Sequence, residues 1–351
     1  MGQKNKKVAF FDAKPYDRKS FDLANKEFGF DITYYDAHLN SRTVELAYNY
    51  DAVCVFVNDT INSQVLNGLH KHDVGVIALR SAGYNNVDFK AAFGKVHVVR
   101  VPAYSPCAVA EHAAALMLAL NRKTHRAYYR IRDGNFSING LLGFDMHGKT
   151  AGIIGTGKIG RCLISILQGF GMKVLVYDVY RDEKYEKEAG IRYVALDKLF
   201  READIISLHC PLTPETEHMI NEDNIKKMKD GVMIINTGRG KLINTRALIK
   251  MLKSGKLGSA GLDVYEEEGE YFFEDFSTEM ISDDVLARLM IFPNVLITSH
   301  QGFFTKEAIH NIAVTTLENI KGFFNGGYLK NEICYQCDLK ECRKDKKQRC
   351  F

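Results

Sequence analysis

A glycine-rich turn between two apolar runs constrains the fold of this chain more than any other feature. The first run, 150–154, leads into a turn with the spacing Gly-x-Gly-x-x-Gly, and an amphipathic segment follows over 159–170. A second apolar run, 174–177, then ends at Asp178. The spacing is formed by three residues: Gly155, Gly157 and Gly160. Strand, tight turn, helix, strand and acid in this order predict a parallel α/β unit that binds a dinucleotide.

Each glycine of the motif meets a different steric demand. Gly155 permits the tight turn, Gly157 lets backbone N–H groups approach a pyrophosphate, and Gly160 lets the helix pack on the strand. The helix N-terminus adds the positive end of its dipole. Asp178 can accept both hydroxyls of an adenosine ribose and would repel a 2′-phosphate, and the nearest arginine is Arg181. We therefore expect NAD rather than NADP. A glycine-rich turn without a ligand is the alternative, and the flanking elements disfavour it.

The length and composition indicate a globular chain with room for two domains. The 351 residues are 46% hydrophobic and 26% charged, and no apolar run approaches the roughly 18 residues that a membrane span needs. No apolar leader precedes Asp12, so we expect a cytoplasmic protein. The net charge of +4 comes from the two ends. Residues 1–7 hold three lysines and no acid, and residues 338–351 hold six basic and three acidic residues. The body therefore has no basic excess for nucleic acid or a membrane surface.

The eight cysteines fall into two groups. Four lie in apolar or helical segments, where buried, reduced thiols are expected: Cys54, Cys107, Cys162 and Cys210. The other four crowd the basic end of the chain: Cys334, Cys337, Cys342 and Cys350. Cys-x2-Cys is a spacing that zinc sites use, but the other gaps are irregular and no histidine is near. We expect no metal and a disordered tail, with a zinc site as the alternative.

Residues 7–101 alternate apolar runs with polar or helical segments, which predicts a second parallel sheet. Its expected strands are 8–11, 52–57, 74–79 and 96–99, and its expected helices are 21–28 and 65–70. This region lacks the glycine spacing, so it is not a second dinucleotide half. A glycine-containing loop, 80–88, follows one of its strands at the end where α/β sheets place ligands, although a simple turn is an alternative.

A single long helix is expected over 106–132, with Ser105 as its cap and Pro106 at its first position. Its first half is rich in alanine and its second half is basic. We interpret it as the crossing between domains. The alanine-rich half can pack closely on another helix, either in the same chain or in a second subunit. The segment 134–148 is expected to be a loop.

Four further strands are expected after Asp178: 203–209, 232–235, 258–265 and 295–298. Each delivers polar residues at its C-terminal end, and these ends share one edge of a parallel sheet. A last helix over 306–324 is expected to return to the first domain. The segment 269–291 lacks periodicity and is expected to be a surface insertion.

Three polar residues follow strands at this edge: Arg239, Glu268 and His300. Hydride transfer to a ketone needs a proton donor, which a histidine supplies near neutral pH and a carboxylate can orient. A guanidinium binds the carboxylate of a 2-oxo acid through two bonds. Taken singly, a structural histidine, a loop arginine and a solvated acidic run are good alternatives. Their joint position beside the expected nicotinamide favours catalysis.

The chain resembles the D-isomer-specific 2-hydroxyacid dehydrogenases along nearly its whole length. The matching motifs are Gly155–Gly160 with Asp178, 209–213, 236–240, 261–268 and 299–301. Within the family it is most similar to the fermentative D-lactate dehydrogenases. That closer similarity is carried by Asn58-Asp59, 78–80, 100–104, 272–275, and 300–301 with 303–305.

The resemblance implies a role for each matched residue. Arg239 would hold the substrate carboxylate, His300 would be the general acid and base, and Glu268 would pair with His300. Asp263 would lie near the nicotinamide. The implied substrate residues are Ala82, Gly83, Tyr104, Arg239 and His300. The implied cofactor residues are Gly155, Gly157, Lys158, Ile159, Gly160, Asp178, Cys210, Pro211, Thr216, Thr237, Gly238, Arg239 and Asp263.

The resemblance also implies the architecture: two flavodoxin-like or Rossmann-like α/β domains, each a parallel sheet flanked by helices. The NAD-binding domain, 102–299, would be inserted into a discontinuous substrate domain, 1–101 with 300–351, and the cleft would close on binding. A homodimer or homotetramer is expected. The expected reaction is the reversible reduction of pyruvate to D-lactate by NADH. A longer 2-oxo acid or glyoxylate as substrate, or a NAD-sensing corepressor, are the alternatives.

Overall fold

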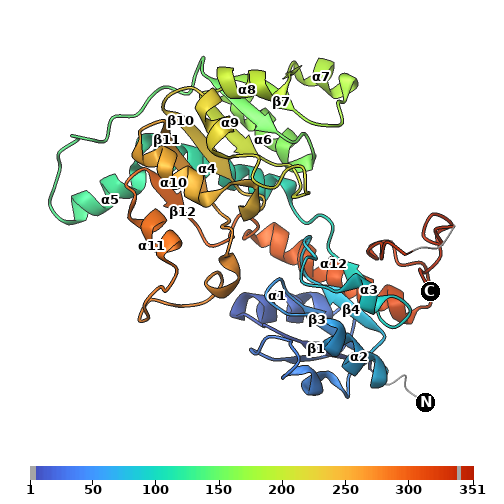
Figure 1. Cartoon of the computed structure of the whole chain (residues 1–351). Helices are drawn as coiled ribbons and strands as arrows, with labels where there is room; N and C mark the ends of the chain where they lie inside the picture. Colours follow the sequence, from blue (N-terminus) through green and yellow to red (C-terminus); the bar gives the residue numbers. More distant parts are fainter. Residues whose placement is uncertain (1–4, 338–340) are drawn as a thin grey trace. The chain divides into compact units, whose positions relative to one another are not determined.

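The computed structural model describes residues 5–337 and 341–351, and it divides the chain into two compact units (Figure 1). Unit 1 holds Met1–Ser105 with Phe304–Phe351, and unit 2 holds Pro106–Phe303. Unit 2 is therefore inserted into unit 1 along the sequence. We expected the chain to cross between the two domains after residues 101 and 299, and the division falls four residues later at each crossing.

Unit 1 is built on a parallel sheet whose described strands have the order β2-β1-β3-β4-β5. The strands are β1 (Lys7–Phe10), β2 (Asp31–Tyr34), β3 (Ala52–Val55), β4 (Val76–Leu79) and β5 (His97–Arg100). The helices are α1 (Pro15–Asn25), η1 (Val44–Ala47), α2 (Ser63–Lys71), α3 (Phe89–Ala92) and α12 (Lys306–Phe324). As expected, the last helix returns to the first part of the chain, because α12 packs against α1 and β4.

Two expectations for unit 1 are wrong. The helix expected over 21–28 is α1, which begins six residues earlier at Pro15. A proline fits the first turn of a helix because the N–H it lacks would have no partner there. The strand β2 was not predicted, because it lies at the sheet edge with exposed or half-buried residues and no continuous apolar run.

Unit 2 is built on a larger parallel sheet, with the order β12-β11-β10-β9-β6-β7-β8 among the described strands. The strands are β6 (Thr150–Ile154), β7 (Lys173–Tyr177), β8 (Arg192–Tyr193), β9 (Ile205–Leu208), β10 (Val232–Asn236), β11 (Leu257–Leu262) and β12 (Val295–Ile297). The helices are α4 (Pro106–Arg122), α5 (Thr124–Arg132), α6 (Lys158–Gly169), α7 (Glu183–Ala189), α8 (Leu196–Glu202), α9 (Glu222–Lys227), η2 (Gly240–Leu242), α10 (Thr245–Lys253), η3 (Glu268–Glu270) and α11 (Asp284–Ile291). Two parallel sheets flanked by helices confirm the expected fold class.

The long helix expected over 106–132 is wrong, because the chain breaks into α4 and α5 at Lys123. Lys123 adopts left-handed backbone angles, with φ of 49°, which end a helix. Its ammonium group donates to the carbonyl oxygens of Gly140 and Leu142 at 3.0 and 2.9 Å. The side chain thus ties the break to the loop that follows α5.

The segment 269–291, expected to be a surface insertion without periodicity, contains a helix in its second half. Residues Asp284–Ile291 form α11, and the Asp283 carboxylate caps it by accepting from the N–H groups of Val285 and Leu286. The helix buries Leu286 and Leu289 against the core of unit 2. A helix this short is stabilised by tertiary packing rather than by its own periodicity, so the sequence pattern did not reveal it.

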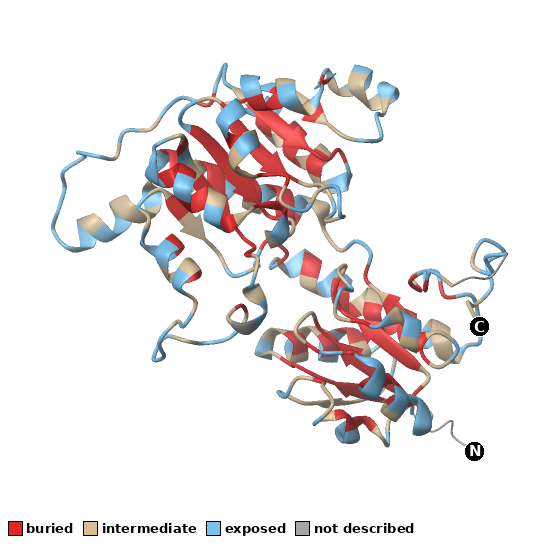
Figure 2. Ribbon diagram, in the orientation of Figure 1, coloured by how far each residue is buried: buried red, intermediate tan, exposed pale blue. Residues whose placement is uncertain are grey.

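The core of unit 2 fills both faces of its sheet, and the strands are the most buried elements in Figure 2. Along β10, Ile234 joins the apolar cluster beneath α8 and α10, whereas Met233 and Ile235 join the cluster beneath α4 and α6. This alternation is the two-residue period of a strand with both faces covered. No helix in residues 5–337 and 341–351 has the length and apolar character to cross a membrane.

The chain end packs against unit 1, whereas a disordered tail was expected. Tyr335 is buried, and its hydroxyl accepts from the N–H of Val98 at 2.7 Å and donates to the carbonyl oxygen of Val96 at 3.1 Å. The Phe351 ring stacks on His97 with centroids 4.1 Å apart. Residues 338–340 lie outside the described part. Among the tail residues that are described, no three ligand side chains lie close enough together to share one ion.

Candidate active site

The glycine turn of unit 2 has the steric features that its sequence predicts. Gly155 follows β6 with φ of +100°, and a Cβ there would lie 2.6 Å from the carbonyl group of His209. A Cβ on Gly160 would overlap the carbonyl oxygen of Gly155, so α6 can approach the turn only with glycine at this position. Gly157 precedes α6 and is exposed, and a Cβ there would meet nothing within 4 Å. Open space in front of a helix N-terminus is what a pyrophosphate needs.

The first residues of α6 differ in exposure. Lys158 is exposed and Ile159 is half-buried, and both begin the helix directly after Gly157. Their backbone N–H groups belong to the first turn, where a helix has unsatisfied donors. The structure therefore places Lys158 and Ile159 where their backbone can contribute to an anion site.

Asp178, at the end of β7, is tied to the same turn. One carboxylate oxygen accepts from the N–H and hydroxyl of Thr156 at 2.7 and 2.9 Å, and the other accepts from the N–H of Tyr180 at 2.9 Å. Burial pushes the pKa of Asp178 up, but these hydrogen bonds outweigh it and lower the pKa below its usual range. The carboxylate is therefore ionised at neutral pH. Arg181 is exposed.

The loop after β9 carries three of the expected cofactor residues. Thr216 closes this loop, because its hydroxyl donates to the carbonyl oxygen of Pro211 and accepts from the N–H of Thr213, both at 2.8 Å. Burial raises the pKa of the half-buried Cys210 thiol to about 11, so it stays protonated at neutral pH. His209 precedes it and meets Ser207 at 2.8 Å, and burial lowers the pKa of His209 to about 4.

The loop after β10 holds a buried hydroxyl, that of Thr237, to which a bound ligand could hydrogen-bond. Thr237 is buried, and within the described residues its Oγ1 has no hydrogen-bond partner. Leaving such a group unpaired costs about 1–3 kcal/mol. Gly238 is next, and its N–H donates to the Asn236 side chain at 3.0 Å. A cofactor polar group beside Thr237 would satisfy the hydroxyl.

Arg239 is half-buried between two glycines, and its guanidinium donates to the carbonyl oxygen of Gly238 at 2.7 Å. A Cβ at Gly240 would overlap the carbonyl oxygen of Tyr265, so the loop after β10 can lie against the end of β11 only with glycine there. The other N–H donors of the guanidinium could bind both oxygens of a substrate carboxylate at the same time.

His300 and Glu268 form a pair at the ends of the neighbouring strands β12 and β11. His300 Nδ1 lies 3.1 Å from Glu268 Oε1, and both side chains are about a quarter exposed, at 24% and 27%. His300 has left-handed backbone angles, with φ of 48°, and its N–H donates to the carbonyl oxygen of Asp263 at 2.8 Å. Strained backbone of this kind recurs at functional sites. The pair was predicted from the sequence.

Asp263 follows β11 and is buried beside the turn that carries His300. Its buried carboxylate accepts from the Thr298 hydroxyl at 2.5 Å and from the N–H groups of Gln301 and Gly302 at 2.9 and 2.8 Å. His112 of α4 lies 3.2 Å away. Burial pushes the pKa of Asp263 up, but these partners lower it overall. Asp263 therefore fixes the turn that carries His300.

The sequence interpretation missed His112 and Thr298. Thr298 Oγ1 lies 3.0 Å from His112 Nε2 and also donates to Asp263, so the three side chains form one network. A histidine within an alanine-rich helix was a signal that could have been followed. Its partner could not be found, because α4 and β12 are far apart in the sequence.

The three expected substrate residues of unit 1 are held by local contacts. Arg100 donates to the carbonyl oxygen of Ala82 at 2.6 Å, and the Ser81 hydroxyl donates to that of Gly83 at 2.8 Å. The carbonyl oxygen of Tyr104 accepts from Asn311 at 2.7 Å. Ala82 and Gly83 are half-buried, so their backbone is within reach of a small ligand.

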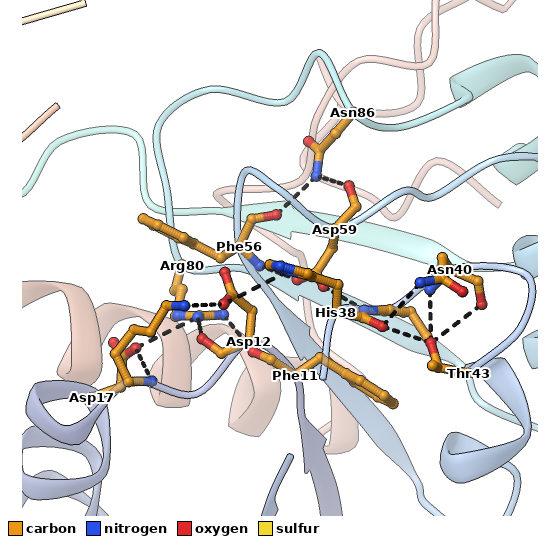
Figure 3. A network of polar contacts seen from close by, with 12 residues as sticks. Phe11, Asp12, Asp17, His38, Asn40, Thr43, Phe56, Asp59, Arg80 and Asn86 are labelled. Atoms are coloured by element: carbon orange, nitrogen blue, oxygen red, sulfur yellow. Dashed lines mark hydrogen bonds and ion pairs between the residues drawn. The ribbon is translucent and has the colours of Figure 1, made fainter. Parts of the chain in front are cut away.

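A buried arginine, missed in the sequence, anchors that loop (Figure 3). Arg80 donates to the carbonyl oxygens of Phe11 at 3.0 Å and Asp12 at 2.5 Å, and it lies 3.5 Å from Asp17. Its guanidinium also lies over the ring of Phe56 at 4.6 Å. Arg80 thereby connects the ends of β1, β3 and β4, and the loop with Ala82 and Gly83 begins at the next residue.

Asp59 completes the buried network of Figure 3. Its carboxylate accepts from the N–H groups of Leu39 and Phe56 at 2.5 and 2.6 Å. Burial raises the pKa of Asp59 to about 6 and also raises that of Asp17, although Arg80 opposes both shifts. Arg80 therefore favours the ionised form of both carboxyls, against the effect of burial.

The residues after three neighbouring strands of unit 2 thus share one sheet edge. Arg239 follows β10, Glu268 follows β11 and His300 follows β12, with the glycine turn at β6 on the same edge. The open space at Gly157, the ionised Asp178 and the unpaired Thr237 hydroxyl fit a dinucleotide. A titratable pair beside such a cofactor is suited to hydride transfer coupled to proton transfer.

Comparison with known proteins identifies the family of this chain. The family model described as D-isomer specific 2-hydroxyacid dehydrogenase, NAD binding domain, matches residues 114–302. The D-lactate dehydrogenase of Escherichia coli strain K12 is 52% identical over 329 residues, which cover 93% of this chain and 99% of that protein. The apo-structure of the Escherichia coli D-lactate dehydrogenase has a TM-score of 0.86 at 50% identity, covering 93% of this chain and 100% of that one.

A cofactor-bound structure is similar as well. The NAD-complexed form of the D-isomer specific 2-hydroxyacid dehydrogenase from Lactobacillus delbrueckii ssp. bulgaricus has a TM-score of 0.80 at 33% identity, covering 93% of this chain and 100% of that one. Family model, sequence relatives and folds all agree with the motifs around Gly155 and His300. The chain belongs to the D-isomer-specific 2-hydroxyacid dehydrogenases, a family of NAD-binding oxidoreductases.

Proposed function

We propose that this chain is a fermentative D-lactate dehydrogenase that reduces pyruvate reversibly to D-lactate with NADH. The observation that carries the proposal is the partly exposed His300–Glu268 pair, beside Arg239 at the edge that bears the glycine turn. The choice of substrate is supported by the name of the Escherichia coli relative, which is 52% identical over nearly the whole chain.

His300 is the proton donor in this proposal. Glu268 engages Nδ1 at 3.1 Å, which leaves Nε2, on the other side of the ring, to give its proton to the carbonyl oxygen of pyruvate. In the reverse direction the same nitrogen takes the hydroxyl proton of lactate. Glu268 fixes the ring orientation and stabilises the imidazolium. When bound, the nicotinamide supplies or accepts the hydride.

Arg239 binds the substrate carboxylate through its remaining donors in this proposal. On unit 1, the proposed substrate residues are the backbone of Ala82 and Gly83, together with Tyr104. Arg80 is a positioning residue for the loop of Ala82 and Gly83, because its hydrogen bonds to the carbonyl oxygens of Phe11 and Asp12 fix the residue at which the loop begins. We assign the substrate domain to unit 1 and the NAD-binding domain to unit 2, since the substrate loop lies in the former and the glycine turn in the latter.

NAD rather than NADP is the cofactor in this proposal. The carboxylate of Asp178 is ionised, because hydrogen bonds from Thr156 and Tyr180 lower its pKa. A negative charge at this position repels a 2′-phosphate and accepts bonds from ribose hydroxyls. The rest of the proposed cofactor site is lined by residues of the loops after β9 and β10: Cys210, Pro211, Thr237 and Gly238.

A homodimer or homotetramer is also proposed, with α5 and the loop after it as the contact. No residue of α5 is buried, and the helix and the loop after it are drawn in the tan and pale blue of half-buried and exposed residues in Figure 2. Several apolar side chains are nevertheless exposed there: Tyr128, Tyr129, Ile131, Phe136, Ile138 and Leu142. Such a patch is unfavourable in water and fits the same patch of a second copy. Light scattering of the purified protein should give a mass of two or four times 39.7 kDa. A mass of one chain would contradict it.

The oxidation of NADH with a panel of 2-oxo acids tests the activity. Pyruvate should be turned over well, and chiral analysis should give D-lactate. Equal or faster turnover of longer 2-oxo acids or glyoxylate would reject the lactate assignment while keeping the enzyme class. Binding of NADH without turnover of any acid in the panel would favour a NAD-sensing corepressor instead. NADPH should be used poorly, and comparable use of both cofactors would contradict the role of Asp178.

A further inference from the structure

Two free thiols touch each other in unit 2. Cys107 lies in the first turn of α4 and Cys162 in the second turn of α6, and their Sγ atoms are 3.1 Å apart. A disulfide bond is about 2.05 Å long, so a shift of about 1 Å closes the gap. Cys107 is exposed and Cys162 is half-buried, so a small oxidant in solvent can reach the pair.

The packing of α4 on α6 holds the two sulfurs together. The side chains on the face of α4 that packs against α6 are small. They belong to Ala110, Ala113 and Ala114, which share an apolar cluster with Leu163 and Leu167 of α6. Small side chains let two helices approach closely. The alanine-rich half of the expected helix therefore packs within the chain, which is one of the two partners that the sequence allowed.

We propose that Cys107 and Cys162 are a redox modification site, at which a hydroperoxide forms a reversible disulfide that links α4 to α6. This inference does not depend on the proposed function. In residues 5–337 and 341–351, no other two cysteine sulfurs lie this close together, and Cys54 is buried.

The chemistry proceeds in two steps. The exposed Cys107 sulfur attacks one oxygen of hydrogen peroxide, so that an S–O bond forms, the O–O bond breaks and one water leaves, which gives a sulfenic acid. The Cys162 sulfur then attacks the Cys107 sulfur, the S–S bond forms and the S–O bond breaks. Burial, and next the hydrogen bond with Cys107, raise the pKa of Cys162 to about 11. Cys162 therefore carries the proton that the departing hydroxide takes as the second water.

The two thiols lose two electrons and two protons, and the peroxide is reduced to two waters. A dithiol reverses the bond by exchange. The link joins positions 55 residues apart, and it fixes the first turn of α4 two residues after the chain leaves unit 1. A loop of this length restricts the unfolded chain, so the oxidised form should melt about 5–10 °C higher.

The test uses the reduced full-length protein, treated with hydrogen peroxide with or without dimedone, then alkylated and digested without reductant. Mass spectrometry should find the peptide that joins Cys107 to Cys162, and dithiothreitol should remove it together with the rise in melting temperature. In Cys162→Ser, dimedone should label Cys107 strongly, because the sulfenic acid has no second thiol to attack. In the wild-type protein that label should be weak. Cys334→Ser, an exposed cysteine of unit 1, is the matched control and should behave as wild type.

Three outcomes overturn the proposal. The first is equal dimedone labelling of Cys107 in wild type and Cys162→Ser. The second is cross-linking that joins the tail cysteines in place of Cys107 and Cys162. The third is a joined peptide without any rise in melting temperature. Cys162→Ala repeats the test if the serine variant is unstable, because alanine leaves no polar group in the helix contact.

Discussion

The carboxyl edges of the two sheets carry polar networks with opposite properties. In unit 1, Arg80 is 2% exposed, and its donors are taken up by the backbone of β1 and by Asp17. In unit 2, His300 and Glu268 are about a quarter exposed, and the pair is connected through one ring nitrogen. Each edge also has a left-handed residue that is not glycine, Asp12 in unit 1 and His300 in unit 2.

This difference in exposure gives the two networks different roles: the buried one supports the fold, and the partly exposed one can take part in a reaction. A buried cation surrounded by fixed acceptors cannot exchange a proton or reach a substrate, but its removal leaves buried carboxyls without a counter-charge. A partly exposed histidine with one nitrogen engaged keeps the other for proton transfer. The same type of sheet edge therefore stabilises a loop in unit 1 and presents a reactive group in unit 2.

Replacing His300, in the partly exposed network of unit 2, should have the largest effect of the predicted substitutions, and this effect should be on kcat. His300→Gln can still bond to Glu268 but carries no titratable proton, so kcat should fall by about 10²–10⁴. NADH affinity, measured by fluorescence, should stay close to wild type. His218→Gln is the matched control, because His218 pairs with Glu266 at 2.6 Å in the same unit, and its loss of kcat should be far smaller. A loss below tenfold in His300→Gln would contradict the acid–base role.

Replacing Arg80 should act on stability instead. Arg80→Met keeps much of the volume but leaves Asp17 and Asp59 buried without a cation, which should cost about 3–5 kcal/mol in urea unfolding. Since burial raises the pKa of both carboxyls, the loss should shrink as the pH falls toward 5 and they become neutral. NADH binding by unit 2 should persist. A variant as stable as wild type at pH 7 would show that the network contributes nothing to the fold.

Replacing Arg239 tests the geometry of the substrate contact. Arg239→Lys keeps the charge but loses the two-pronged donor, so KM for pyruvate should rise about tenfold, equivalent to ~1.4 kcal/mol. Steady-state kinetics measure this, and kcat should change less than KM. Arg246→Lys, at an exposed position of α10, is the control and should leave KM unchanged. An unchanged KM in Arg239→Lys would mean that another group holds the carboxylate.

The last prediction concerns the pH dependence of stability and His209. Its pKa is lowered to about 4 by burial, whereas the unfolded chain titrates near 6.5, so the unfolded state binds more protons between these values. The free energy of unfolding should therefore be constant above pH 6.5 and fall as the pH drops toward 4, by less than about 3 kcal/mol. His209→Gln should flatten that slope in urea titrations at several pH values. An unchanged slope would assign the acid sensitivity to other groups.

The short-range patterns of the sequence predicted most of the unit 2 site. The glycine spacing depends on steric demands within a few residues, and the structure shows the predicted open space at Gly157 and the close approach at Gly160. Strand ends place their polar residues by a simple rule, so Arg239, Glu268 and His300 could be found together without coordinates. The packed chain end, the break at Lys123 and the helix α11 were not predicted, because the groups that hold each of them in place are distant in the sequence.

By itself, then, the sequence determined the two parallel sheets and the dinucleotide turn, since these follow from residue types at fixed spacing, whereas the histidine–glutamate pair was expected from the resemblance to a known family. Only the tertiary structure decided that Asp263 holds the His300 turn together with His112, and that Arg80 closes the edge of unit 1. It also brought the sulfurs of Cys107 and Cys162 to 3.1 Å. The physical reason is the same in each case. A buried polar or reactive group takes its properties from neighbours that the fold supplies, and those neighbours lie on elements with no fixed spacing in the chain.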